Sequence, residues 1–457
     1  MSFIKMLSRF ANLKYFPLVS SLILIIPFTL LPIISSSHFS IISKAWAATY
    51  TTQNILSRSP DDIVPSTFFG MHIHFLATGT PWPTISFGTL RLWDADVIWP
   101  SLEPNKGEWH FEKLDTNVNL TEAHNVEILM TLGQSPTWAS ARPAETFPKT
   151  YNTGSAAEPA NIEDWKNYVR TVATRYKGRI RYYEIWNEPN LSNFYSGTVD
   201  QMVTLAREAY TILKEVDRTV KVVSPSVTGA FGIPWLEQYF IKGGANYTDI
   251  IGYHFYVFPA PPEAMVSVIK NVKQTMTKYG ISNKPLWDTE AGWSKPKVFS
   301  SDSEASVYVA RSYILNWATG IDRFYWYAWD NHKWVTLEMT KTDNKTLKPA
   351  AIAYREVQKW IVGAKVLSCV QDSQGTWLAQ ITRDNGYKGF IIWNPDKTIN
   401  FEIPIEWNVK QMNDLTGSTT DITGASQLNI GMAPILLENV LSSPAITPPW
   451  NIRIITN

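Results

Sequence analysis

The regular alternation of short apolar segments with helical segments after residue 60 limits the fold of this chain more than any other feature. Strands that alternate with helices form a parallel sheet, because each helix returns the chain to the same starting edge. Eight such units within about 300 residues fit a closed barrel better than an open sheet. The strands are predicted at Phe68–His74, Thr89–Trp93, Glu127–Leu132, Tyr182–Trp186, Lys221–Ser224, Ile250–His254, Pro285–Thr289 and Arg323–Tyr327. The predicted fold is α/β, a (β/α)₈ TIM barrel over residues 61–362.

The pattern changes beyond Trp360. Short apolar runs follow one another there without helices between them, separated by Gly, Asn, Asp and Pro. We expect strands at Thr376–Thr382, Gly389–Trp393 and Phe401–Ile405. These predict a small antiparallel β-domain over residues 363–440, followed by a loosely ordered, proline-containing tail at 441–457.

The first 47 residues have the pattern of an export signal. A basic leader precedes the mostly apolar run Phe16–Ser35, and Ala45-Trp46-Ala47 has the small-x-small pattern of a cleavage site. Cleavage there would make Ala48 the first residue of a secreted or periplasmic protein. The apolar run is about 20 residues long, so retention as a membrane anchor is the alternative, with the globular part still outside the cytoplasm.

Charge and cysteine content exclude several classes of partner. The chain has 41 Lys and Arg against 40 Asp and Glu, whereas a nucleic-acid partner calls for a basic surface. The single cysteine, Cys369, allows no intrachain disulfide and no cysteine-type zinc site. The sequence makes no prediction of oligomeric state.

In a (β/α)₈ barrel the functional groups lie at the C-terminal ends of the strands. Polar and aromatic side chains follow most of the predicted strands at that point. In strand order they are His72 and His74, Arg91, Trp138, Asn187 with Glu188, His254 with Tyr256, Asp288 with Glu290, and Trp326, Trp329 and Asp330.

Two glutamates stand out among these strand ends. Glu188 follows the fourth strand and Glu290 the seventh, three positions apart among eight, so we expect them to face each other across the barrel mouth. Glycoside hydrolysis needs two carboxyl groups that flank the scissile bond. A separation of about 5–5.5 Å gives a covalent intermediate and retention, and roughly 6.5–9.5 Å gives inversion.

The segments around both glutamates resemble clan A glycoside hydrolases. Trp186-Asn187-Glu188-Pro189 is similar to the Asn-Glu-Pro signature of that clan, and Asp288-Thr289-Glu290 resembles its seventh-strand nucleophile segment. The nearest families are family 39, which holds β-xylosidases and exopolysaccharide endoglycosidases, and family 5. The resemblance covers about residues 61–360. It implies a retaining glycosidase acting on a β-linked carbohydrate, with Glu188 as acid/base and Glu290 as nucleophile.

The resemblance also implies roles for neighbouring residues. Arg91 would keep Glu290 ionised, Tyr256 would donate a hydrogen bond to it, and Asn187 would bind the sugar 2-hydroxyl. Trp326 would form a stacking floor beneath the sugar. The remaining candidates for substrate binding are His74, Trp138, His254 and Trp329. Neither a cofactor nor a metal is expected.

Three alternatives stay open at this point. A transglycosylase would use the same residues with a sugar as acceptor, and a noncatalytic carbohydrate-binding barrel would usually lack one of the carboxylates. His72 and His74 also resemble the first metal motif of amidohydrolases, but that motif needs a histidine on the fifth strand, and Lys221–Ser224 offers none. The sugar, the linkage and the choice between endo and exo cleavage depend on loops that the sequence leaves undetermined.

Overall fold

The computed structural model describes residues 53–146 and 152–440. The predicted export signal at 1–47 and the predicted tail at 441–457 lie outside these residues. Among the described residues, no helix is long and apolar enough to cross a membrane.

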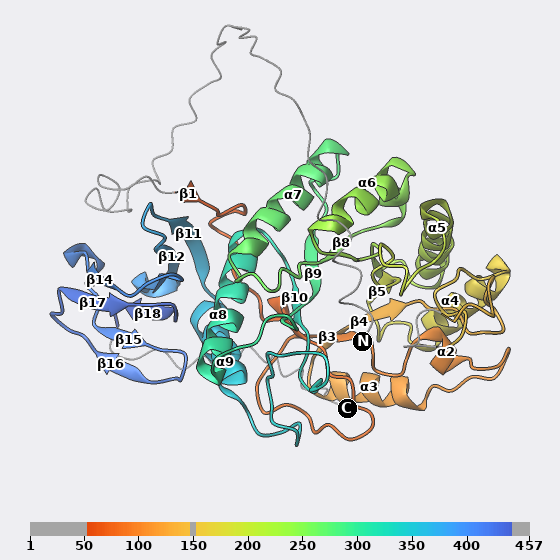
Figure 1. The fold of residues 1–457 in the computed structure, drawn as a ribbon, viewed down its shortest axis with the longest axis horizontal. Helices are drawn as coiled ribbons and strands as arrows, with labels where there is room; N and C mark the ends of the chain where they lie inside the picture. Colours follow the sequence, from red (N-terminus) through yellow and green to blue (C-terminus); the bar gives the residue numbers. More distant parts are fainter. Residues whose placement is uncertain (1–52, 147–151, 441–457) are drawn as a thin grey trace, which may run out of the picture. The chain divides into compact units, whose positions relative to one another are not determined.

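The barrel is a parallel sheet, and all eight predicted strands are present in it (Figure 1). Its strands run in the order β6-β5-β4-β3-β2-β10-β9-β8-β7. They are β2 (Phe69–Met71), β3 (Thr89–Leu92), β4 (Glu127–Leu132), β5 (Tyr182–Ile185), β6 (Lys221–Val223), β7 (Val227–Thr228), β8 (Ile251–His254), β9 (Leu286–Ala291) and β10 (Phe324–Trp326).

The fifth barrel strand is split in two, and both halves contribute to closure. Pro225 separates β6 from β7, because proline has no N–H to give to the ladder. Before the break Val223 forms a bridge to Ile250, and after it β7 pairs with β8. The ninth strand is therefore the second half of the fifth, and the sheet closes as a (β/α)₈ barrel.

Helices follow the strands and lie around them (Figure 1). Capping signals in the sequence explain where several begin. Asn161 accepts a hydrogen bond from the N–H of Glu163, and Thr198 forms a reciprocal capping box with Gln201. The helices are α2 (Trp99–Leu102), α3 (Glu112–Ala123), α4 (Ile162–Arg175), α5 (Val199–Val216), α6 (Ile233–Ile241), α7 (Ala264–Lys278), α8 (Asp302–Ala318) and α9 (Pro349–Ile361).

The C-terminal strands form the predicted antiparallel structure. The main sheet contains β11 (Lys365–Gln371), β12 (Trp377–Thr382), β13 (Lys388–Trp393), β15 (Gln411–Asn413), β16 (Thr419–Asp421) and β18 (Ile435–Glu438), and β14 (Ile399–Glu402) pairs separately with β17 (Gln427–Ile430). One strand was not predicted. The short β1 (Gln53–Asn54), which precedes the barrel in the chain, pairs with β11 at the edge of this sheet.

A buried ion pair between α8 and the start of α7 is joined to the C-terminal sheet by a hydrogen bond. Arg311 on α8 lies 3.2 Å from the Glu263 carboxylate, and its side chain is 2% exposed. The Trp393 indole N–H on β13 donates to the same carboxylate at 3.0 Å. Removing one partner of a buried pair leaves the other charge without compensation, which is costly.

We therefore expect Arg311→Met to lower the free energy of unfolding by about 3–5 kcal/mol in a urea titration. Arg170→Met is the matched control, because Arg170 and Glu215 form an exposed pair with side chains 50% and 53% exposed. Its loss should cost about 0–1 kcal/mol. Equal decreases in the free energy of unfolding for the two variants would show that the Arg311 pair contributes no more than a surface ion pair.

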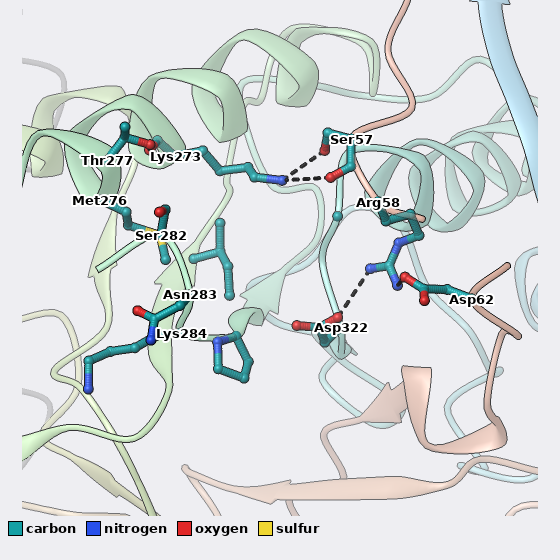
Figure 2. Close-up of a pocket in the computed structure, with 13 residues that line it drawn as sticks. Ser57, Arg58, Asp62, Lys273, Met276, Thr277, Ser282, Asn283, Lys284 and Asp322 are labelled. Atoms are coloured by element: carbon teal, nitrogen blue, oxygen red, sulfur yellow. Dashed lines mark hydrogen bonds and ion pairs between the residues drawn. The ribbon is translucent and has the colours of Figure 1, made fainter. Parts of the chain in front are cut away.

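A cavity of about 280 Å³ lies at the N-terminal ends of the strands (Figure 2). Its lining includes Pro285 and Leu286 at the start of β9, and Asp322 before β10. Arg58 and Lys273 donate hydrogen bonds to protein oxygens around it. This cavity lies at the other end of the strands from Glu188 and Glu290.

Candidate active site

A charged network fills the barrel interior below the C-terminal strand ends. Arg91 on β3 is fully buried and donates through Nε to Glu184 at 2.7 Å, through Nη1 to Glu290 at 2.7 Å, and through Nη2 to the Asn187 amide oxygen at 2.8 Å. Glu184 on β5, also fully buried, accepts further bonds from Thr131 and Ser226. One guanidinium thus compensates two carboxylates and fixes their positions.

Glu290 lies near the end of β9 and is 7% exposed. Its second oxygen, Oε1, accepts a hydrogen bond of 2.9 Å from the Tyr256 hydroxyl. Burial raises the pKa of Tyr256 well above its usual range, so this phenol remains an O–H donor. Glu290 therefore has a cation on one oxygen and a neutral donor on the other, an arrangement that stabilises the carboxylate form. Both contacts are those predicted from the sequence.

Glu188 lies just beyond β5 and is also 7% exposed. Its φ of 45° and that of Trp186 at 64° lie in the left-handed region, where non-glycine residues cost of order 1–3 kcal/mol. The Glu188 N–H donates to the Ser226 carbonyl at 2.9 Å, which holds this turn against the fifth strand. In this turn the carboxyl group lies next to His254 and near Glu290.

His254 lies between the two glutamates. Its Nδ1 is 2.9 Å from Glu188 Oε1 and 4.0 Å from Glu290 Oε1. Burial lowers the pKa of His254 to about 4, so the imidazole is neutral near pH 7. A neutral ring next to Glu188 adds no positive charge that would favour its carboxylate form.

The glutamates themselves lie close together. One donor atom each from Glu188, His254 and Glu290 falls within 4.8 Å of the others. Among the described residues this is the cluster whose geometry would suit a metal, and it includes neither His72 nor His74. His72 Nε2 instead contacts the Thr289 carbonyl at 3.1 Å. The amidohydrolase alternative is therefore not supported by the arrangement of these histidines.

Burial makes both carboxyl groups harder to ionise. It raises the pKa of Glu188 to about 7 and that of Glu290 to about 7, and the mutual repulsion of the two charges adds to the increase at Glu290. The hydrogen-bond partners of the two carboxyl groups differ. Glu290 is bonded to Arg91 and Tyr256, which favour its carboxylate form, whereas Glu188 faces a neutral imidazole.

Two further predicted residues lie at this site. The Asn187 oxygen is bonded to Arg91, which directs the N–H donors of the amide away from the guanidinium. The His74 ring lies 5.0 Å from the Tyr327 ring, and its buried Nε2 has no hydrogen-bond partner among the described residues. Asp330 positions His74 by accepting its backbone N–H at 2.8 Å.

Two predicted tryptophans do not reach the site. Trp326 is fully buried, and its ring packs against Trp293 and Tyr313 on the helix side of β10. Trp329 is 1% exposed and donates to the Asn344 carbonyl. Strand side chains alternate between faces, so a strand that turns Tyr325 into the barrel turns Trp326 out.

Trp138 is placed elsewhere in the loops. Its indole N–H donates to the Glu103 carbonyl, its ring meets Trp99 edge to face, and the Lys106 ammonium lies 5.5 Å from the ring. These contacts tie Trp138 to the segment that follows β3. They give it no direct link to Glu188 or Glu290.

Sequence reasoning missed Tyr327 and Asp94. Tyr327 contacts the His72 and His74 rings, and its hydroxyl donates to Asp94 at 2.8 Å. Asp94 follows β3 with a φ of 58° and raises the pKa of both Glu188 and Glu290. The alternation that corrects Trp326 also identifies Tyr327 as inward-facing, and Asp94 directly follows a predicted strand.

Comparisons with known proteins find glycosidases among the relatives of this chain. Residues 134–354, which contain both glutamates, match the family described as glycosyl hydrolase catalytic core. A β-xylosidase from Caldicellulosiruptor saccharolyticus is 30% identical over 133 residues, which are 27% of this chain and 26% of that protein. A β-xylosidase from Geobacillus stearothermophilus is 23% identical over 231 residues, 44% of this chain and 45% of that protein. The matches thus span less than half of either relative.

The fold is shared with solved glycoside hydrolases. A family 39 glycoside hydrolase from Bacteroides cellulosilyticus WH2 superposes with a TM-score of 0.66 at 19% identity, covering 82% of each chain. At this identity the likeness concerns the fold alone. Residues 134–354 therefore match the glycosyl hydrolase catalytic core, and the chain shares its fold with a family 39 glycoside hydrolase.

Proposed function

We propose that this chain is a retaining β-glycosidase that works by double displacement, with Glu188 as acid/base and Glu290 as nucleophile. The observation that carries the proposal is the pair of buried carboxyls whose nearest atoms lie within 4.8 Å at the ends of the fourth and seventh strands. A gap of about 5–5.5 Å suits a covalent intermediate, since it leaves no room for water between nucleophile and sugar.

The first step forms a glycosyl ester. A Glu290 oxygen attacks the anomeric carbon while the bond from that carbon to the leaving oxygen breaks. Glu188 gives its proton to the leaving oxygen. Arg91 remains on the other Glu290 oxygen, and the Asn187 amide is placed to donate to a sugar hydroxyl.

The second step reverses these roles. Water enters where the leaving group was, and Glu188, now a carboxylate, takes one of its protons. The water oxygen attacks the anomeric carbon, and the ester bond to Glu290 breaks. Both carboxyls return to their starting states, and two inversions at one carbon give net retention.

We propose β-xylosides as the first substrates to test, because the two relatives described above are named β-xylosidases. A 2-fluoro-xyloside with an activated leaving group should trap the glycosyl ester, since fluorine slows the second step. Peptide mass spectrometry should then place the label on Glu290. A label on another residue, or turnover without any labelling, would reject the assignment.

The reaction should lose rate as pH rises past about 7. Glu188 must carry a proton to serve as the acid, and burial raises its pKa to about 7, so the active form declines above that pH. The measurement is the profile of kcat/KM against pH with an aryl β-xyloside whose leaving group needs protonation. A rate that stays constant well above neutrality would contradict the acid role.

Asp94→Asn should move this alkaline decline to lower pH. The negative charge of Asp94 raises the pKa of Glu188, so its removal makes Glu188 easier to ionise. The expected displacement is on the order of half a pH unit. Asp343→Asn, a change at an exposed carboxylate in the loop after β10, should leave the profile in place. Identical profiles for Asp94→Asn and the unaltered protein would show that Asp94 does not influence the acid.

We further propose that residues 1–47 direct export, on the basis of the sequence pattern alone. Expression of the full chain in a secreting host, followed by N-terminal sequencing, tests this. A secreted protein that begins at Ala48 agrees with a cleaved signal. A full-length membrane-bound product would favour the anchor.

A further inference from the structure

Exposed aromatic side chains are few in the described part of the chain, and they are not scattered. Three Phe, Tyr or Trp side chains are exposed there: Phe75 at 49%, Phe231 at 67% and Trp334 at 43%. Each lies in a segment that follows a barrel strand, namely β2, β7 and β10. All three therefore belong to the end of the barrel that carries Glu188 and Glu290.

Trp334 is held in place from two sides. Its backbone N–H donates to the Asn331 side chain at 2.9 Å, and its carbonyl accepts a hydrogen bond from Ser294. Val335 forms a backbone bridge to Ser294, which lies shortly after the nucleophile Glu290. The segment with Trp334 is thus fastened to the chain that leaves β9.

Perpendicular rings surround the Trp334 indole. Its ring centre lies 5.6 Å from that of Tyr256, 5.4 Å from that of Tyr327 and 6.0 Å from that of Phe258. Tyr256 is the residue that donates to Glu290. The indole therefore packs against Tyr256, the residue that contacts Glu290, and remains partly open to solvent.

Phe231 follows β7, whose end is joined to the loop that carries Glu188. It lies in the turn Ala230–Gly232, after Gly229 with a φ of 65°. The preceding Thr228 exchanges two hydrogen bonds with Asn190, its N–H donating to the Asn190 oxygen at 3.0 Å and its carbonyl accepting from the amide at 3.3 Å. Asn190 is two residues beyond Glu188, so the end of β7, three residues before Phe231, is joined to the loop that carries Glu188.

We propose that Phe231 and Trp334 are stacking surfaces for sugar rings on the two sides of the scissile bond, and that this protein cleaves within an oligosaccharide chain. The proposal rests on the proposed function. The acid protonates the leaving oxygen, so the leaving sugar lies on the Glu188 side, where Phe231 is exposed. Trp334, fastened beside Glu290, then meets the other part of the chain.

Physical reasons support this use of the rings. The C–H faces of a pyranose are apolar, and they gain contact area and lose hydrated surface when they lie on an aromatic ring. A ring whose backbone is already fixed loses little conformational freedom on binding. An enzyme that removes one terminal sugar needs a single closed subsite, whereas sites on both sides of the bond suit a chain that continues in both directions.

The test compares substrate lengths. We expect kcat/KM of the unaltered protein to increase by about tenfold or more from xylobiose to xylohexaose. The first products from the hexaose should be two molecules of xylotriose, or xylobiose together with xylotetraose. Trp334→Ala and Phe231→Ala should each lower the ratio of the hexaose rate to the aryl xyloside rate by about tenfold. Ile405→Ala, which removes another exposed apolar side chain (92% exposed) from the C-terminal domain, should not change this ratio.

A binding measurement separates contact from chemistry. In the Glu188→Gln background, calorimetry with xylohexaose should show an affinity about tenfold lower for each aromatic variant than for the parent. Release of single xylose units from one end of the hexaose, or aromatic variants that behave like Ile405→Ala, would overturn the inference and leave the proposed function intact. Failure of the proposed function is recognised separately, by the absence of a labelled Glu290.

Discussion

Replacing Glu290 by alanine should lower kcat for an aryl β-xyloside by about 10⁴-fold or more. The reason is the loss of the atom that forms the glycosyl ester, since the rest of the site offers no second nucleophile in the same position. Arg91 would keep its hydrogen bonds to Glu184 and Asn187, whereas Tyr256 would lose its acceptor on Glu290. The measurement is steady-state turnover on protein whose folding has been checked by thermal melting.

The alanine variant also leaves space where the carboxylate was. Added azide should enter that space, attack the anomeric carbon directly and form a glycosyl azide with inverted configuration. Product analysis by NMR distinguishes this product from a retained one. Glu215→Ala is the control, because Glu215 is an exposed carboxylate that pairs with Arg170 at the surface. Substantial turnover by Glu290→Ala without azide would refute the nucleophile assignment.

Replacing Glu188 by glutamine should have an effect that depends on the leaving group. The glutamine amide has nearly the same shape as the glutamate carboxyl group. It has no acidic proton that it could give to the leaving oxygen. For xylobiose, whose leaving oxygen needs protonation, kcat/KM should fall by about 10²–10⁴-fold. For a dinitrophenyl xyloside, the leaving group departs as the anion and needs no proton. The rate of the first step should therefore fall far less with this substrate.

The two substrates serve as controls for each other, since a general distortion of the site would slow both. A second signature concerns pH. The decline above about pH 7, which reflects the raised pKa of Glu188, should disappear in the glutamine variant with the dinitrophenyl substrate. Equal losses for both substrates, with the alkaline decline retained, would assign the acid to a different residue.

The local pattern of this sequence was enough to predict the barrel and its two glutamates. All eight barrel strands were predicted from apolar runs between helical segments, because strand and helix formation depend on neighbouring residues. The rule that functional groups collect at strand ends then selected Glu188, Glu290 and Arg91. Because side chains in a strand alternate between its two faces, an error of one residue in choosing the inward-facing position selects a side chain on the wrong face. Trp326 was selected in place of Tyr327 for that reason.

Contacts between distant segments could not be read from the chain. β1 joins the C-terminal sheet across more than 300 residues, with Gln53 paired to Gln371, and no local signal marks such a partner. The same holds for the hydrogen bond between Tyr327 and Asp94, and for the one by which Thr228 joins the end of β7 to Asn190 in the Glu188 loop.

The sequence by itself determined the barrel, its order of strands and the two carboxyls at its mouth. Only the tertiary structure decided that these carboxyls share one small volume and that Arg91 compensates Glu290 and Glu184 together. It also decided that Glu188 faces a neutral histidine. The physical reason is that propensity and periodicity act over a few residues, whereas desolvation and charge pairing depend on groups that meet only when the barrel closes.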